Sequence, residues 1–278
     1  MKKLIVIMIA FLGLAVMAQA QEKEDFTSDR GVYMMPESGD IGLGFNAVPF
    51  LNYLGNAFNG TADNSISVSF INNQAIVGKY YLSDDAAARG ELRIGYLNDK
   101  NAEFIQKDQD IPDPDVLVED IEHTGTTNVH VGAGYEMRRG HGRLQGYYGG
   151  MLMLNYFASN TKYDYGNPIT ADFNSPNFTN FGGNLTTDGR VLESYNQSMG
   201  AGLRGFIGVE YFFLPKISIG GEFGWGFNYN FMLKSEETAE MWNGTEIETN
   251  TTEQAKDATF NLDTDNNYMG SIFMIFHF

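Results

Sequence analysis

The sequence has no cysteine, few basic residues and, after its first twenty residues, no long hydrophobic run. The absence of cysteine excludes a disulfide-stapled scaffold and any metal or redox site built on thiolates. Lysine and arginine number 18 against 35 aspartate and glutamate residues, which gives a net charge of −17. Nucleic-acid binding needs clustered cations that neutralise phosphates, so we exclude that class of partner. Beyond residue 20 no run approaches the roughly 20 apolar residues of a membrane-spanning helix.

Glycine and aromatic residues are plentiful. The chain of 278 residues contains 32 glycines, and 14% of its residues are aromatic and 43% hydrophobic. The hydrophobic content excludes a disordered chain. The aromatic content favours β structure, because aromatic side chains pack well on a pleated surface.

The first twenty residues have the layout of a secretory signal peptide. Lys2 and Lys3 precede an apolar run from Leu4 to Met17, and Ala18-Gln19-Ala20 offers a small-x-small cleavage site. We predict cleavage after Ala20. The alternative is a retained membrane anchor, although the run is shorter than a spanning helix needs. Residues 21–39 are then a short periplasmic lead.

Eight later segments alternate apolar and polar residues, the period expected of strands with two different faces. In the clearest of them, Phe223, Trp225 and Phe227 share one face, while Glu222 and Asn228 lie on the other. In a soluble sandwich the apolar face would be the packed core; in a small membrane barrel it would meet lipid. The eight segments cover about 40–48, 75–82, 88–98, 126–138, 142–157, 197–213, 216–232 and 267–278.

The connections between these segments alternate in length. Short turns are expected at 83–87, 139–141 and 214–216, and long polar loops at 49–74, 99–125, 158–196 and 233–266. This asymmetry is typical of outer-membrane barrels, which have short periplasmic turns and long outer loops. The sequence therefore predicts an all-β fold over 40–278: an eight-stranded antiparallel transmembrane β-barrel. An extra hairpin from Ser65 to Phe70 would raise the count to ten if it paired with part of 158–196; otherwise it would extend the first hairpin above the membrane.

The last segment ends on an aromatic residue, with Tyr268, Ile272, Met274, Phe276 and Phe278 on one face. In this the chain resembles the small outer-membrane β-barrel proteins of Gram-negative bacteria, the group that contains the transmembrane domain of outer membrane protein A. The segments 39–44 and 78–84 also look like barrel proteins of Bacteroidetes. The resemblance implies location in the bacterial outer membrane among its lipid and lipopolysaccharide. It also implies that Tyr268, Phe276 and Phe278 are the signal read by the barrel-assembly machinery.

The polar faces of the segments carry a set of charges that would point into the barrel. Unpaired buried charges are costly, so we expect these side chains to pair with one another. An eight-stranded interior is about wide enough for its own side chains to fill it, which favours a plug; the alternative is a gated, ion-selective pore. The set is Lys79, Arg89, Glu91, Arg93, Glu136, Arg138, Arg143, Arg204, Glu210 and Glu222.

The long segments offer weaker candidates. The acidic run from Asp108 to Asp115 could offer oxygen ligands to Ca²⁺, but it lacks the glycine and bidentate glutamate of a recognised calcium loop, so a solvated loop is the favoured interpretation. The apolar stretch from Pro49 to Phe58 is expected to pack over the barrel mouth, lie at the lipid boundary or dock on a protein partner. His123 beside Glu122 could activate a hydroxyl nucleophile, as in outer-membrane lipid hydrolases, but no spacing identifies that nucleophile.

These patterns predict a non-catalytic structural or interaction protein with a plugged lumen, binding a protein partner through long acidic extracellular loops. A small gated porin is the alternative, and an outer-membrane lipid hydrolase a third hypothesis. The sequence predicts neither a cofactor nor a metal ion.

Overall fold

The structure is a computed structural model of the chain, and it describes all residues except 1–26, 29–30, 48–50, 54–55, 57–74 and 265–271. The signal peptide, the Ser65–Phe70 hairpin, Tyr268 and most of the apolar stretch 49–58 therefore lie outside the described residues. The described part of the chain is all-β, with strands that pair antiparallel throughout. It holds no helix long and apolar enough to span a membrane.

Among the described residues, eleven strands form one sheet. They are β1 (Ile41–Asn46), β2 (Ile76–Ser83), β3 (Ala86–Gln106), β4 (Leu117–His141), β5 (Leu144–Asp164), β6 (Leu185–Thr186), β7 (Gly189–Leu214), β8 (Ile217–Trp242), β9 (Ile247–Glu253), β10 (Ala258–Thr264) and β11 (Ile272–His277).

Eight of these strands pair in a closed ring. The order is β1-β2-β3-β4-β5-β7-β8-β11, and β11 returns to β1. On one side β11 places Ile272 opposite Gly221 of β8, and on the other it places His277 opposite Gly42 of β1. The prediction of eight antiparallel strands is thus confirmed for the ring. Short turns are also found between β2 and β3, between β4 and β5, and between β7 and β8. The second of them lies at Gly142 and Arg143, so the prediction of a turn at 139–141 is wrong: these residues still pair with β5 and belong to β4.

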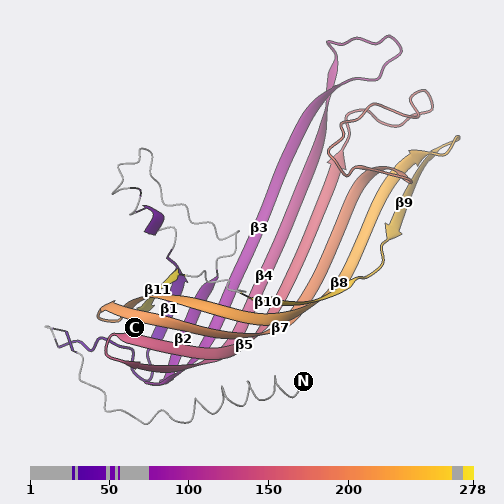
Figure 1. The fold of residues 1–278 in the computed structure, drawn as a ribbon. Helices are drawn as coiled ribbons and strands as arrows, with labels where there is room; N and C mark the ends of the chain where they lie inside the picture. Colours follow the sequence, from indigo (N-terminus) through magenta and orange to yellow (C-terminus); the bar gives the residue numbers. More distant parts are fainter. Residues whose placement is uncertain (1–26, 29–30, 48–50, 54–55, 57–74, 265–271) are drawn as a thin grey trace.

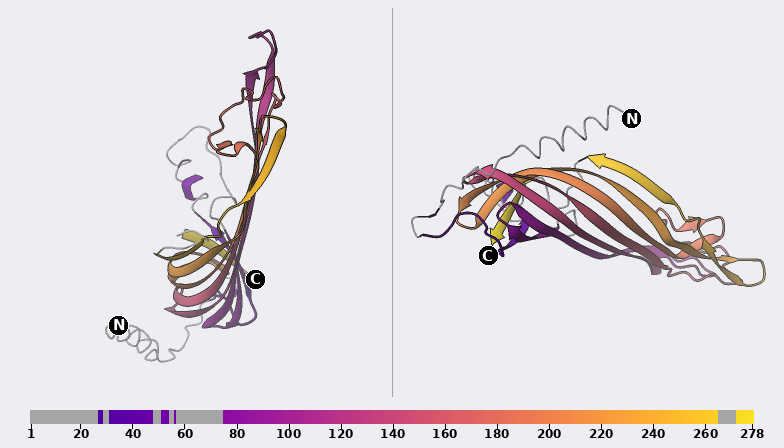
Figure 2. Two further views of the ribbon diagram at one scale, coloured as in Figure 1. Left: turned by 90° about the vertical axis from the view of Figure 1, so that its right-hand side faces the viewer. Right: turned by 90° about the horizontal axis from the view of Figure 1, so that it is seen from below.

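Five strands run far beyond the ring. The β3 ladder with β2 reaches only Leu92, whereas its ladder with β4 continues to Gln106, which faces Leu117. Figures 1 and 2 show β3, β4, β5, β7 and β8 leaving the ring as one curved sheet, which we call the extension. At its far side β9 folds back onto β8.

The extension corrects the prediction of long loops at 99–125, 158–196 and 233–266. The strands continue through 99–106, 117–125, 158–164, 189–196 and 233–242, as in the ladder from Thr126 opposite Leu97 to Ile121 opposite Ala102. The prediction was wrong because an alternating hydrophobic pattern detects a strand only when one of its faces is apolar. It does not detect the pairing of the backbone with a neighbouring strand. Here both faces of the sheet carry mostly polar side chains, so the pattern disappears while threonine-rich strands still pair.

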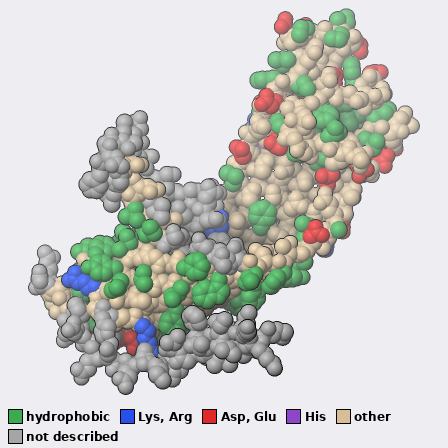
Figure 3. Space-filling view, in the orientation of Figure 1, with side chains coloured by type: hydrophobic (Ala, Val, Ile, Leu, Met, Phe, Trp, Pro, Cys, Tyr) green, Lys and Arg blue, Asp and Glu red, His purple; other side chains and the backbone are tan. Residues whose placement is uncertain are grey.

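The ring has an apolar outside and a polar inside. Along β8, Phe223, Trp225 and Phe227 are exposed, while Glu222 and Asn228 are buried. The same alternation occurs along β7, where Leu203 is exposed and Arg204 buried. Figure 3 shows hydrophobic side chains gathered over the ring and acidic ones spread over the extension. The ring thus reverses the usual arrangement of a globular domain, in which apolar side chains are inside.

The described part of the N-terminal lead contacts the end of the ring that carries the short turns. The Lys216 backbone N–H donates to Met34 O at 3.0 Å, and the Met34 side chain is buried. The Gly39 N–H donates to Tyr81 O at 2.8 Å, and the Lys216 ammonium forms an ion pair with Asp40. The lead is therefore packed against the ring at this end.

We expect the Asp40–Lys216 contact to stabilise the fold at neutral pH and to lose this effect at acid pH. Burial raises the pKa of the Asp40 carboxyl, but hydrogen bonds from Lys216 and from the Glu37 N–H outweigh it and hold that pKa below its ordinary value of 3.8. A lowered pKa stabilises the fold above the unfolded value, and this contribution is lost as pH falls through the folded value. Asp40→Asn should therefore lose less stability than the wild type between neutral pH and pH ~3, measured by urea unfolding. Equal losses in the two proteins would contradict this role.

Candidate functional site

The interior of the ring holds a buried network of ion pairs, whose first group lies near the short turns. The Lys79 ammonium of β2 lies 2.9 Å from Glu136 of β4 and 3.6 Å from Glu210 of β7. The Arg138 guanidinium reaches the same two carboxylates, at 3.2 Å and 2.9 Å. His277 of β11 lies 3.3 Å from Glu210. Four strands therefore contribute to one cluster.

The second group lies deeper in the ring. Arg89 of β3 forms ion pairs with Glu222 of β8 at 2.5 Å and with Glu91 at 2.8 Å. Arg204 of β7 shares Glu222, at 2.7 Å, and lies 3.8 Å from Glu91. His130 of β4 lies 3.5 Å from Glu91. Glu91 and Glu222 therefore each form ion pairs with both arginines.

The two groups are one network, because Arg89 also lies 3.7 Å from Glu136. Within it the four cations Lys79, Arg89, Arg138 and Arg204 face the four carboxylates Glu91, Glu136, Glu210 and Glu222, and their side chains are at most 2% exposed. Formal charge is balanced among these eight side chains. Balance matters because removing one partner of a buried pair leaves an uncompensated charge.

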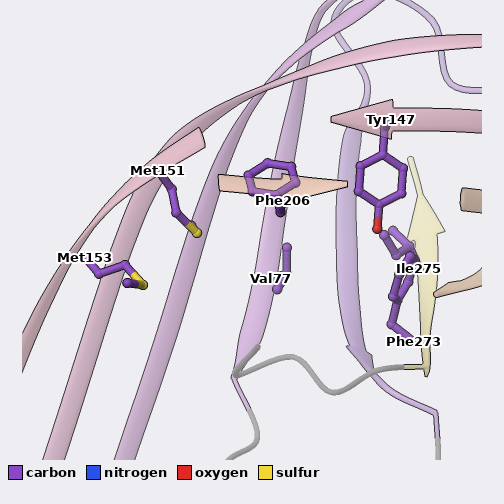
Figure 4. Close-up of a cluster of buried hydrophobic side chains, with 7 residues drawn as sticks. All are labelled: Val77, Tyr147, Met151, Met153, Phe206, Phe273 and Ile275. Carbon is purple, nitrogen blue, oxygen red and sulfur yellow. The ribbon is translucent and has the colours of Figure 1, made fainter. Parts of the chain in front are cut away.

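Aromatic and apolar side chains fill the space beside the charges. Figure 4 shows Tyr147, Phe206 and Phe273 with Val77, Ile275, Met151 and Met153. The Tyr147 hydroxyl donates to Glu222 at 2.9 Å, and Lys79 lies 4.6 Å from the centre of the Tyr147 ring. The Arg89 guanidinium lies 4.5 Å from the centre of the Phe206 ring. Such cation–π contacts gain strength when water is excluded.

Glycines on the inner face make room for these large side chains. A Cβ added at Gly224 would lie 2.5 Å from Arg204 Nη2, and one added at Gly208 would lie 2.3 Å from the Tyr147 ring. Both distances are shorter than real Cβ contacts, so a larger residue would displace the network. The many glycines on the polar faces of the strands thus have a packing role.

The structure places nine of the ten predicted lumen charges inside. Eight form the network, and Arg93 is 7% exposed and faces His130 across the β3–β4 ladder. Arg143 is the exception: it is exposed in the turn between β4 and β5, where Gly142 has a φ of 59°. The alternation of apolar and polar residues assigned Arg143 to the inward face of a strand. It did not reveal that this position lies in the turn.

The network includes residues that the prediction did not name. Tyr81 accepts a hydrogen bond from Arg138 at 2.9 Å, and Ser218 donates one to Glu210. Tyr147 belongs to the same class. Its position on the inward face of β5 could have predicted that Tyr147 reaches the network. His130 also joins the network: it contacts Glu91 and, at 2.7 Å, Asn155.

The remaining candidates lie elsewhere. His123 is a half-buried residue of the extension, 3.7 Å from Asp164. Phe276 and Phe278 end the chain on the outside of the ring, and Phe278 exchanges backbone hydrogen bonds with Ile41. Asp108 binds Asn177 through both carboxylate oxygens, at 2.8 Å each. In the described ranges no three histidine, aspartate or glutamate side chains are grouped to hold a metal ion.

Hydrogen bonds to Asp120 hold the segment between β5 and β7 against the extension. This buried carboxylate accepts hydrogen bonds from the N–H groups of Gly166 at 2.8 Å and Thr179 at 2.6 Å. Nearby, the Arg190 guanidinium lies 4.3 Å from the centre of the Tyr165 ring and 2.7 Å from Glu240. The segment is therefore packed on the sheet.

We expect Asp120→Ala to release this segment without unfolding the ring. Two backbone donors would lose their acceptor, at a local cost of about 1–3 kcal/mol. Limited proteolysis should then cleave within 165–188 faster than in the wild type. Asp110→Ala, which removes an exposed carboxylate of the segment between β3 and β4, should leave the rate unchanged. Unchanged cleavage of the Asp120 variant would show that Asp120 does not hold the segment.

No model of a known protein family matches the chain, and no curated protein sequence matches it.

Proposed function

We propose that the chain is an outer-membrane β-barrel of a Gram-negative bacterium, acting as a non-catalytic structural or interaction protein with a closed lumen. The observation that carries the proposal is the apolar outer surface of the ring. It comes from every strand of the ring, and its exposed members include Leu43, Ile76, Leu92, Val131, Leu152, Leu203, Phe227 and Ile272. A continuous apolar surface of this kind is unfavourable in water, and a closed ring leaves no unpaired strand edge in lipid.

The polar interior supports the same proposal. In a membrane barrel apolar residues face out and polar residues face in, as they do on β7 and β8. An eight-stranded barrel is about narrow enough for side chains to fill it. The balanced network, together with Tyr147, Phe206 and Phe273, would leave no continuous path for water or ions.

The extension would then stand outside the cell. The short turns and the packed N-terminal lead lie at the opposite end of the ring from the extension, as expected for the periplasmic side of a barrel. The polar faces of the extension suit water rather than lipid, and their acidic side chains suit a surface that meets other molecules. We therefore propose that the extension binds other molecules and that the ring keeps the lumen closed.

Single-channel conductance tests the closed lumen. The mature chain, folded in detergent and checked by the heat-dependent shift in its gel mobility, would be inserted into a planar bilayer. We expect no steady conductance from the wild type. Reproducible ion-selective openings would contradict the proposal and favour a gated porin. Arg143→Ala serves as a matched control because Arg143 lies outside the network, and it should be as silent as the wild type.

A further inference from the structure

The apolar outside of the ring has a hollow near the short turns, which we call the turn-side hollow. Its volume is about 560 Å³. It forms where Gly146 of β5 lies opposite Val209 of β7, and Val209 lies opposite Gly221 of β8, because the two glycines leave the backbone uncovered on the outer face. The apolar side chains that line it further from the turns are Tyr148, Ile207 and Phe223.

A second hollow, the Trp225 hollow, lies four residues further along β5 and has a volume of about 570 Å³. There Gly150 of β5 lies opposite Gly205 of β7, and Gly205 lies opposite Trp225. Four residues of a strand rise about 13 Å. One leaflet is about half of the roughly 30 Å hydrocarbon core of a bilayer. The two hollows therefore extend over about the depth of one leaflet.

A cation lies at one side of the turn-side hollow. Arg139 of β4 lies opposite Gly146, lines the hollow and is exposed. Tyr211, which is 44% exposed one row nearer the turns, belongs to the aromatic residues expected where a barrel crosses the interface. Among the described residues no carboxylate forms an ion pair with Arg139, and this includes Asp84 and Asp85 of the neighbouring turn. An anionic group outside the protein would complement this charge.

We propose that the two hollows bind one anionic glycerophospholipid, with its phosphate on Arg139 and an acyl chain lying over Gly146 toward Trp225. A guanidinium donates strong, often bidentate, hydrogen bonds to a phosphate. The chain would gain dispersion contacts where the glycines let it approach the backbone.

A second copy of the chain fits the hollows less well. It would bring Arg139 of each copy into an apolar contact that supplies no carboxylate for it. The inference rests on the proposed function, which puts the outside of the ring in lipid, and it adds the class of lipid that the ring selects there.

Quenching of Trp225 by brominated lipids tests the inference. The Trp242→Phe variant of the mature chain would be reconstituted in phosphatidylcholine vesicles that contain increasing fractions of phosphatidylglycerol or of phosphatidylcholine, each brominated on its acyl chains. We expect the phosphatidylglycerol to bind about fivefold more tightly, because one arginine near an anionic lipid contributes roughly this much. Arg139→Ala should remove this preference. Arg143→Ala is the matched control, since Arg143 lies in the turn at the same end and does not line the hollow, and it should keep the preference.

Gly146→Leu tests the hollow rather than the charge. A Cβ added at Gly146 would lie 3.3 Å from the Arg139 carbonyl oxygen, a contact that a shift of a few tenths of an ångström relieves. The leucine side chain would then occupy the hollow while Arg139 stays in place. We expect this variant to weaken the quenching by brominated phosphatidylglycerol, and the heat-dependent shift in gel mobility would check that each variant is folded.

Three results would contradict the inference. Equal quenching by the two lipids, or a preference that Arg143→Ala removes as fully as Arg139→Ala, would overturn it and leave the barrel proposal standing. A dimer that Gly146→Leu dissociates would also overturn it, because a second copy would then occupy the hollow. A Trp225 that neither lipid quenches would instead refute the proposed function, on which the inference depends.

Discussion

Glu222→Leu is expected to destabilise the folded protein by about 3–5 kcal/mol, the usual cost of removing one partner from a buried ion pair. Glu222 contacts Arg89 at 2.5 Å, Arg204 at 2.7 Å and the Tyr147 hydroxyl at 2.9 Å. Without it, two guanidinium groups would face each other inside the ring with one fewer carboxylate. Urea unfolding in lipid vesicles, followed by tryptophan fluorescence, would measure the change.

A second substitution distinguishes the loss of charge from the loss of packing. Glu222→Leu/Arg204→Leu removes one charge of each sign, so it restores the balance among the remaining six side chains. We expect the double variant to be more stable than Glu222→Leu alone, a coupling that a double-mutant cycle would measure. If Glu222→Leu were as stable as the wild type, the network would not hold the interior together.

Leu203→Arg is expected to cost about 2–4 kcal/mol, the penalty for an arginine on the lipid face of a barrel near the bilayer midplane. Leu203 is 49% exposed on β7, between Leu152 of β5 and Phe227 of β8, which are 50% and 39% exposed. In water the same substitution would replace an exposed leucine by a charge and change stability by no more than about 0.5 kcal/mol. Urea unfolding in vesicles would therefore distinguish the two environments.

Leu117→Arg is the matched control for this experiment. Leu117 is 51% exposed and lies at the far end of the extension, opposite Gln106. Because the proposal puts the extension in water, this variant should keep the wild-type stability. Equal effects of the two arginines would contradict the division of the molecule into a ring in lipid and an extension in water.

The ring was largely predictable from the sequence because its two faces differ so strongly. Residues such as Trp225 and Glu222 alternate along a whole strand, and this alternation gave both the strands and their inward charges. The partners of each charge were not predictable. They depend on strand register, for example on Arg204 lying opposite Gly226 so that its side chain extends to Glu222, and one sequence does not fix register.

The extension was missed because its strands have two polar faces. Residues such as Thr124, Asn160 and Ser194 give no hydrophobic period, although backbone pairing joins them to their neighbours. Asp120 was likewise one acidic residue among many, and only the fold shows that its carboxylate is buried beneath the segment that follows β5. Strands that pair without burying an apolar face leave little trace in the amino-acid composition.

Fluorescence quenching by brominated lipids tests the central claim most directly, because the chain has only two tryptophans. Trp225 lies on the apolar outside of the ring, 48% exposed, and Trp242 lies in the extension opposite Ile247. Each would be measured alone, in the variants Trp242→Phe and Trp225→Phe reconstituted in vesicles. We predict strong quenching of Trp225 by bromine on the acyl chains and none of Trp242. A Trp225 that is insensitive to these lipids, or a Trp242 quenched as strongly, would contradict the account.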